Sequence, residues 1–167
     1  LVTGGGSGIG RAIALALAHE RPRWHIYAVD RSPACLAVAQ RNARRLLRHI
    51  PVFVNADWSA PFADRSLDAM VSNPPYVAEC DHHLQQGDVR FEPRGALAAG
   101  RHGLDDLERL ISDAVRVLKP GGLILLEHAP NQVESLHNTL HNKHFIEITT
   151  VRDIAGLARV TRARKGA

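Results

Sequence analysis

The chain has 167 residues, a formal net charge of +4 and apolar residues at 45% of its positions. This length is sufficient for one domain with a substantial core, and the composition is ordinary for a globular protein. No apolar run approaches the roughly 18 residues of a membrane span and no secretory signal segment is evident, so we expect no membrane partner.

Cysteine usage and the first residue bear on compartment and completeness. Cys35 and Cys80 have no spacing typical of a disulfide framework, which favours a reducing, cytoplasmic location. The chain opens at Leu1, without Met and directly in an apolar run, which we interpret as a fragment of a longer protein.

Four arginines lie within residues 41–48 and a second basic group lies within 159–165. Such a surface suits an acidic or ribosomal partner, although a solvated arginine-rich face is the simpler interpretation.

The N-terminal quarter has the order strand, glycine turn, helix, strand and acid. We expect a strand over residues 1–3, a turn over 4–10, a helix over 11–20 and a strand over 25–30. Glycines let a ligand approach the backbone, and the following helix offers free N–H groups. Asp30, about 20 residues after the glycines, is placed to bind the two hydroxyls of a ribose. The alternative for Asp30 is an N-cap of the next helix.

The next helix and strand are expected over residues 33–48 and 50–54, and Asp57 and Trp58 follow. A carboxylate beside an indole suits an adenine ring, because Asp57 can accept a hydrogen bond from the exocyclic amine and Trp58 can pack on the ring. The alternative for Trp58 is an ordinary place in the core.

A fourth strand over residues 67–71 leads into Asn73, Pro74, Pro75 and Tyr76. The two prolines fix φ, supply no N–H and hold the preceding residue extended. The Asn73 side-chain oxygen and the Pro74 carbonyl can therefore accept both hydrogens of a planar amide or amine, on which Tyr76 can stack. The alternative is an ordinary proline-terminated strand and turn. In an open α/β sheet, this segment and the earlier candidates all fall at the carboxyl edge, where ligands bind.

The remaining elements complete an α/β pattern. A long connection over residues 77–103 suggests a functional loop. It contains Asp81, His82 and His83, but no Cys/His spacing supports a metal site. We expect a helix over 104–118, a stop at 119–122, a strand over 123–127 and a helix over 133–142. Residues 145–151 and 158–163 alternate as an antiparallel hairpin.

Asn73–Tyr76, the run His83–Pro93 and the stop at 119–122 together resemble the release factor glutamine methyltransferases. The resemblance covers most of the chain from Ala12 onwards. It implies a Rossmann-like class I fold that uses S-adenosylmethionine (SAM), with seven mostly parallel strands and an antiparallel C-terminal hairpin. It also implies methyl transfer to the glutamine amide of a Gly-Gly-Gln motif in peptide-chain release factors. Residues 1–167 would be the catalytic domain alone, without the family's N-terminal helical docking domain.

The glycine loop departs from this family. Gly4, Gly6 and Gly8 match its Gly-x-Gly-x-Gly motif, but the loop is about three residues longer and Val2 occupies the position of an acid that orients the loop. Residues 3–12 look instead like the cofactor loop of short-chain dehydrogenases, which bind NAD. That chemistry needs a Tyr and a Lys four residues apart, and neither Tyr27 nor Tyr76 has such a partner.

Three interpretations therefore remain: a SAM-dependent methyltransferase, an NAD-binding oxidoreductase, and a methyltransferase-like domain that has lost activity. A nucleic-acid substrate is not expected, because no cluster of aromatic and basic residues suited to base flipping is evident along the sequence.

Overall fold

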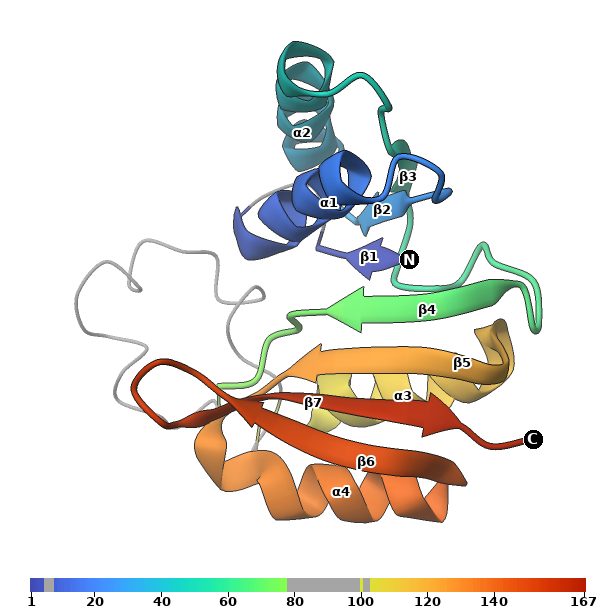
Figure 1. Cartoon of the computed structure of the whole chain (residues 1–167), viewed down its shortest axis with the longest axis vertical. Coiled ribbons are helices and arrows are strands. Elements are labelled where there is room, and N and C mark those ends of the chain that lie inside the picture. The colour runs from blue at the N-terminus through green and yellow to red at the C-terminus, as the bar shows by residue number, and fades with distance from the viewer. Residues whose placement is uncertain (5–7, 78–99, 101–102) are drawn as a thin grey trace.

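The computed structural model describes residues 1–4, 8–77, 100 and 103–167 (Figure 1). Within these residues one sheet contains strands β1 (Val2–Thr3), β2 (Tyr27–Asp30), β3 (Val52–Asn55), β4 (Leu67–Ser72), β5 (Leu118–Glu127), β6 (Phe145–Arg152) and β7 (Ala158–Lys165). The helices are α1 (Gly8–Glu20), α2 (Pro33–Leu46), α3 (Asp105–Val117) and α4 (Val133–Asn142), with a short 3₁₀ turn, η4 (Pro130–Gln132). None of these described helices is long and apolar enough to cross a bilayer.

The seven strands lie in the order β3-β2-β1-β4-β5-β7-β6. Strands β1 to β5 pair in parallel, whereas β7 is antiparallel to both β5 and β6. The expected mostly parallel sheet with an antiparallel C-terminal hairpin is confirmed. The strand order reverses between β1 and β4, and ligands of open α/β sheets bind at such a switch point.

Helices on opposite sides of this switch point build separate parts of the core. Helix α1 packs its alanines and aliphatic residues on β1 and β2, and α2 packs on β2 and β3. Helices α3 and α4 contact each other and cover β5, β6 and β7. The larger cluster is fully buried and includes Met70, Leu110, Ile111, Leu126 and Phe145. Right-handed crossovers explain why the two helix pairs take opposite faces.

Two expected boundaries differ from the structure by more than two residues. The first helix begins at Gly8 rather than at residue 11, because the last glycines of the turn already adopt helical geometry. Residues 119–122 were expected to separate a helix from a strand, but they lie inside β5. Strand β5 begins early because Leu118 already pairs with Leu67, and a register shift after Leu67 accommodates the glycine bend, where Gly121 has φ +76°.

Truncation of a core leucine tests this packing. Leu110 is fully buried between α3 and the sheet, whereas Leu46 at the end of α2 is 68% exposed. We expect Leu110→Ala to lower the free energy of unfolding by about 2–5 kcal/mol, through lost burial and a residual cavity. Leu46→Ala should change it by less than about 0.5 kcal/mol. Urea denaturation measures both values, and equal effects of the two variants would contradict the described core.

Candidate active site

The carboxyl ends of four parallel strands, β1 to β4, meet at one edge of the sheet. At this edge a buried hydrogen bond of 2.5 Å joins the hydroxyls of Thr3 and Ser72, which are neighbours at the switch point. The candidates Gly4, Asp30, Asp57 and Asn73 all lie at or just beyond these strand ends. The structure therefore brings the four segments to one edge, as their places in the sequence predict.

The glycine turn brings the start of α1 against the end of β1. Gly4 has φ +64°, in the left-handed region that favours glycine. A Cβ atom on Gly10 would lie only 2.3 Å from the carbonyl oxygen of Gly4, so no larger residue fits there. Gly8 is the first residue of α1, and Gly6 lies outside the described residues. Sequence reasoning did not single out Gly10, although its place two residues after Gly8 was a usable signal.

Asp30 ends β2 and shapes the turn into α2. One carboxylate oxygen accepts a hydrogen bond from the backbone N–H of Ser32 at 2.8 Å. The N-cap of α2 is Ser32, whose hydroxyl accepts from the N–H of Cys35 at 3.3 Å. The N-cap alternative for Asp30 is therefore wrong, although Asp30 supports the same turn two residues earlier.

Asp57 forms an ion pair that the sequence did not reveal. Its carboxylate lies 2.5 Å from a guanidinium nitrogen of Arg109 on α3, and both side chains are about half exposed. This hydrogen bond raises the pKa of Arg109 above its ordinary value. Trp58, the next residue, has φ +49° and is partly buried against the larger core cluster. The core alternative for Trp58 thus describes part of its environment.

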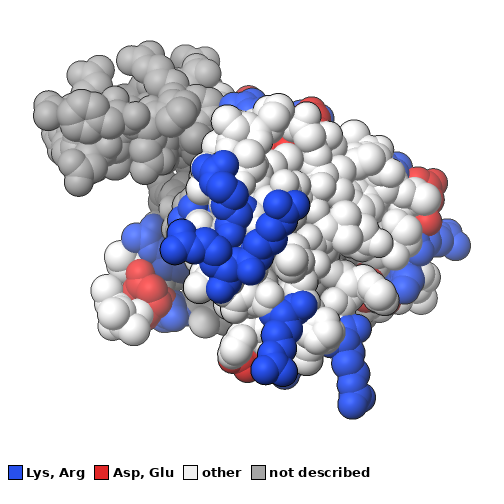
Figure 2. Space-filling view, turned by 90° about the horizontal axis from the view of Figure 1, so that it is seen from above, with Lys and Arg blue, Asp and Glu red and all other residues white. Residues whose placement is uncertain are grey.

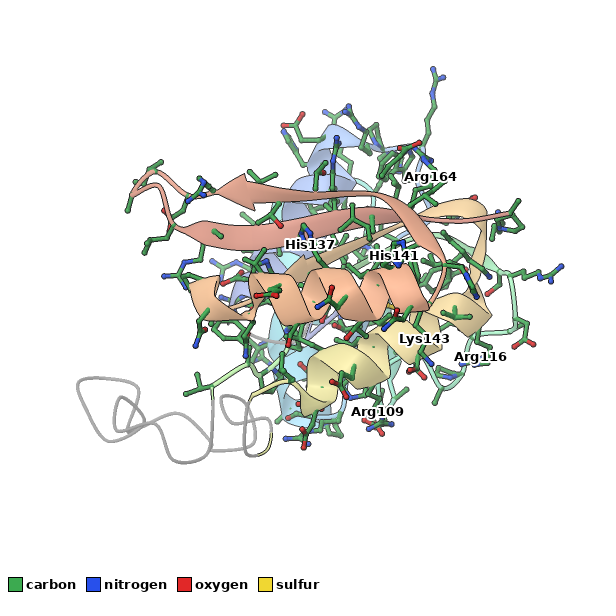
Figure 3. The ribbon with its side chains drawn as sticks, turned by 90° about the horizontal axis from the view of Figure 1, so that it is seen from below. Arg109, Arg116, His137, His141, Lys143 and Arg164 are labelled. Atoms are coloured by element: carbon green, nitrogen blue, oxygen red, sulfur yellow. The ribbon has the colours of Figure 1, made fainter. Side chains whose placement is uncertain are left out.

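The segment that carries Asp57 and Trp58 is fastened to one face of α3. Besides Arg109, Asp113 accepts a hydrogen bond from Ser59 Oγ at 2.9 Å. Arg116 donates to the carbonyl oxygens of Ser59 and Phe62, at 3.1 and 2.6 Å. Arg109 and Arg116 project from α3 toward the same side of the molecule in Figure 3. Because these anchors repeat every three or four residues along a helix, they hold the connection after β3 at a fixed position.

The segment Asn73–Tyr76 leaves β4 without ladder hydrogen bonds of its own. Pro74 is buried and Asn73 is partly buried. Asn73 Oδ1 is fully buried and, among the described residues, has no hydrogen-bond partner. The Tyr76 hydroxyl donates to Glu127 Oε1 at 3.2 Å, and burial together with this carboxylate raises the pKa of Tyr76. The site thus presents a buried amide oxygen beside a phenol that stays protonated near neutral pH.

Gln132 fixes the far end of this segment, and sequence reasoning missed it. Its Nε2 donates to the carbonyl oxygens of Tyr76 and Gly103, at 2.9 and 3.0 Å. Its Oε1 accepts from the N–H of Ala129 at 2.9 Å. A Cβ atom on Gly103 would lie 2.3 Å from the Tyr76 carbonyl oxygen, so glycine is required there. The buried Gln132 carboxamide therefore connects three segments: the end of Asn73–Tyr76, the residues before α3, and the residues that follow the carboxyl end of β5.

A chain of buried and partly buried polar groups supports the same carboxyl end of β5. His128 is fully buried, and its Nε2 lies 2.8 Å from Thr161 Oγ1 on β7. Thr161 forms a hydrogen bond with Thr150 on β6, which in turn forms one with His137 on α4. His137 is labelled in Figure 3. Burial lowers the pKa of His128. A neutral imidazole in this position links β5, β7, β6 and α4 behind Gln132.

Metal ligands do not gather in the described part of the chain. Among the described residues, no group of three His, Cys, Asp or Glu side chains is placed to bind a metal ion. Asp81, His82 and His83 lie outside those residues.

The sheet order and its ligand edge define a class of protein. This architecture is the Rossmann-like fold of class I SAM-dependent methyltransferases. A ribosomal protein L11 methylase from Lactobacillus delbrueckii subsp. bulgaricus shares it with a TM-score of 0.64 and 16% identity, over 94% of this chain and 65% of that one. A methyltransferase from Pyrococcus furiosus has a TM-score of 0.65 at 16% identity, over 93% and 70%.

Residues 3–90 match the family model of the methyltransferase small domain, and the chain belongs to that family. It is similar to proteins named release factor glutamine methyltransferase. It is 44% identical over 95% of its length to those of Salmonella typhimurium and Escherichia coli, and covers 57% of each relative. The Xylella fastidiosa relative is also 44% identical, with 58% covered. The chain thus spans little more than half the length of these curated relatives.

Replacement of Gln132 tests whether its hydrogen bonds to Tyr76, Gly103 and Ala129 stabilise the fold. Gln132→Met keeps the approximate volume but leaves two buried carbonyl groups and one N–H without their partner. We expect the free energy of unfolding to fall by about 2–4 kcal/mol, measured by urea denaturation. Gln40→Met, on the partly buried side of α2, is the matched control and should change it by less than about 0.5 kcal/mol. A Gln132→Met variant as stable as this control would contradict the described role.

Proposed function

We propose that this chain is the catalytic domain of a methyltransferase that acts on the side-chain amide of glutamine in the Gly-Gly-Gln motif of release factors. The observation that carries the proposal is the buried Asn73 Oδ1, which lacks a hydrogen-bond partner among the described residues. A buried acceptor left unpaired costs about 1–3 kcal/mol. A substrate that donates to this oxygen removes that cost when it binds.

A glutamine carboxamide fits this acceptor better than a hydroxyl or a carboxylate does. Its nitrogen carries two hydrogens, and two acceptors are available, Asn73 Oδ1 and the Pro74 carbonyl oxygen. The prolines restrict the backbone at Asn73 and Pro74, so the Pro74 carbonyl group and the backbone that carries the Asn73 side chain are held before the substrate arrives. The 44% identity to proteins named release factor glutamine methyltransferase supports the same substrate.

The residues at the carboxyl edge fit SAM. Gly4 is exposed at the end of β1, and the buried Gly10 lets α1 pack closely behind this turn, because a Cβ atom on Gly10 would clash with the Gly4 carbonyl oxygen. In this proposal the glycine turn holds the methionine part, Asp30 binds the ribose hydroxyls, and Asp57 with Trp58 accommodates the adenine. Val2 replaces an acid in the family's pattern, so the glycine turn and Asp30 carry more of the binding in this chain.

SAM, when bound, supplies an electrophilic methyl group on a sulfonium. Asn73 and Pro74 accept both N–H groups of the substrate and so orient the nitrogen and increase its electron density. An amide nitrogen is a poor nucleophile, and positioning it for an in-line approach is the main contribution of these residues. Tyr76 stays protonated because burial and Glu127 raise its pKa, so it packs against the amide rather than acting as a base. The N–C bond would form as the sulfonium S–C bond breaks, which leaves S-adenosylhomocysteine, and the surplus amide proton would then pass to solvent.

The surroundings of the two tyrosines do not fit the Tyr–Lys pair that dehydrogenase chemistry needs. Tyr27 makes an edge contact with Phe62, with ring centroids 5.3 Å apart, and Tyr76 donates to Glu127. Neither tyrosine precedes a lysine by four residues. The relatives that match across 95% of the chain support the methyltransferase instead.

Replacement of Asn73 is the direct test. We expect Asn73→Ala to lower kcat by about 10²–10³, as removal of one preorganised polar group does in other active sites. The assay measures transfer of a labelled methyl group from SAM to a purified release factor. Asn138→Ala, at an exposed position on α4, is the matched control and should leave kcat unchanged.

Two results would contradict the proposal. One is an Asn73→Ala variant with the activity of the unchanged chain. The other is methyl transfer to a release factor whose Gly-Gly-Gln glutamine has been replaced by glutamate.

A further inference from the structure

A hollow lies at the edge of the sheet opposite the candidate active site. The connection from α1 to β2 and the connection from α2 to β3 run side by side there, and the N–H of Val52 donates to the carbonyl oxygen of Ile26 at 2.8 Å. Between them is a hollow of about 390 Å³, lined by side chains that include Arg23, Trp24, His25, Arg48 and His49. This volume falls within the range of about 300–1,000 Å³ typical of ligand pockets.

Trp24 gives this hollow an exposed aromatic surface. Its side chain is 57% exposed, and the Arg21 guanidinium lies 5.9 Å from the centroid of its ring. Ile50 and Val52 beside it are also about half exposed. Trp24, Ile50 and Val52 thus form an exposed apolar patch rimmed by cations, and patches of this kind mark interaction sites.

The surface around the hollow is strongly basic. Arg41, Arg44 and Arg45 lie exposed on the last turns of α2, which points toward the viewer in Figure 2, where blue side chains gather with little red between them. Together with the arginines at 21, 23 and 48 they make six cations, against one neighbouring carboxylate, Glu20. The net positive charge of this surface is therefore larger than the net charge of +4 of the whole chain.

These arginines differ from the paired cations elsewhere. Arg109, Arg116, Lys119, Arg159 and Arg164 each lie within 4 Å of a carboxylate. In the described part of the chain, none of the ion pairs involves the six arginines around the hollow. Exposed like charges repel one another, so a cluster of six arginines with one neighbouring carboxylate favours an anionic ligand.

The dipoles of nearby helices offset only part of the positive charge of this cluster. Helices α1 and α2 both end at this edge, and each C-terminus is equivalent to about half a negative charge, which cations stabilise. Two such ends offset roughly one of the positive charges. A large positive excess remains.

We propose that the basic hollow, formed by residues 21–25, the last turns of α2 and residues 48–50, binds single-stranded nucleic acid. The arginines would contact phosphates, and a base would stack on Trp24. An acidic protein would satisfy the charge but has no use for an exposed indole between the cations. The site accepts nucleotides without methylating them, because it lies at the amino ends of β2 and β3 and the methyl-transfer residues lie at the carboxyl ends.

The sequence alone predicted no cluster of aromatic and basic residues. The two segments that form the cluster are about 25 residues apart in the chain, and only the parallel pairing of β2 with β3 brings them together. The proposal does not depend on the proposed function, because binding can be measured without SAM or a release factor.

The test is fluorescence anisotropy with labelled 12-nucleotide oligo(U) and oligo(dT), at 50 and 200 mM salt. We expect Arg44→Glu/Arg48→Glu to weaken binding by more than tenfold and to reduce the salt slope by about 0.7 for each phosphate that the variant no longer neutralises. Lys143→Glu/Arg162→Glu changes the net charge equally at positions beside α4 and on β7, and should weaken binding less than threefold. Binding of both oligonucleotides supports the proposal, and preference for oligo(U) assigns RNA as the ligand.

Trp24 provides a second readout, because the chain contains only two tryptophans, Trp24 and Trp58. Oligo(U) should quench tryptophan fluorescence in the unchanged chain and in Trp58→Phe, but not in Trp24→Phe. Trp24→Ala should weaken binding by roughly five- to 150-fold, the effect expected for removal of one stacked base.

Three results would overturn the proposal. They are equal weakening by the two double variants, fluorescence of Trp24 that does not respond to oligonucleotide, and binding of poly-glutamate as tight as that of oligo(U). The last of these would assign the surface to an acidic protein.

Discussion

Two adjacent prolines determine how the rest of the site must be built. Pro74 and Pro75 have no N–H to give to the sheet, so the segment that leaves β4 cannot be held by ladder hydrogen bonds. It is held at its last residue instead, where Gln132 binds the Tyr76 carbonyl and Glu127 binds the Tyr76 hydroxyl. The stiff backbone and this anchor hold the Asn73–Tyr76 segment, in which the Asn73 side-chain oxygen is buried. The exit of β5 and the polar chain behind it therefore belong to the support of the site.

The two ends of the parallel strands have different chemistry. At the carboxyl ends lie glycine, carboxylates, a carboxamide and a phenol, a set suited to a cofactor and a substrate amide. At the amino ends of β2 and β3 lie arginines, histidines and Trp24, a set suited to phosphates and bases. Because α1 and α2 begin at the first edge and end at the second, one pair of helices contributes to both. The separation lets one ligand bind at each edge without competition.

Local sequence patterns predicted most of the fold. The order of elements, the edge shared by Asp30 and Asn73, and the C-terminal hairpin follow from periodicity, turn residues and the rule for open sheets. Contacts between distant segments could not be predicted in this way. The Arg109–Asp57 pair spans 52 residues and the Gln132–Tyr76 bond spans 56, and neither residue type has a spacing that indicates its partner. The inclusion of residues 119–122 in β5 also depends on pairing with β4, which outweighed the local turn signal.

Isothermal titration of the 167-residue chain with SAM, S-adenosylhomocysteine, NAD and NADP examines the carboxyl edge most directly. The structure and its relatives predict binding of SAM and S-adenosylhomocysteine alone. They also predict loss of that binding in Asp30→Ala and its retention in Asp64→Ala, a carboxylate that is 75% exposed. Binding of NAD or NADP without SAM would mean that the glycine loop selects a dinucleotide and would contradict the methyltransferase assignment. Binding of none of the four would mean that the domain has lost its cofactor, and would contradict it equally.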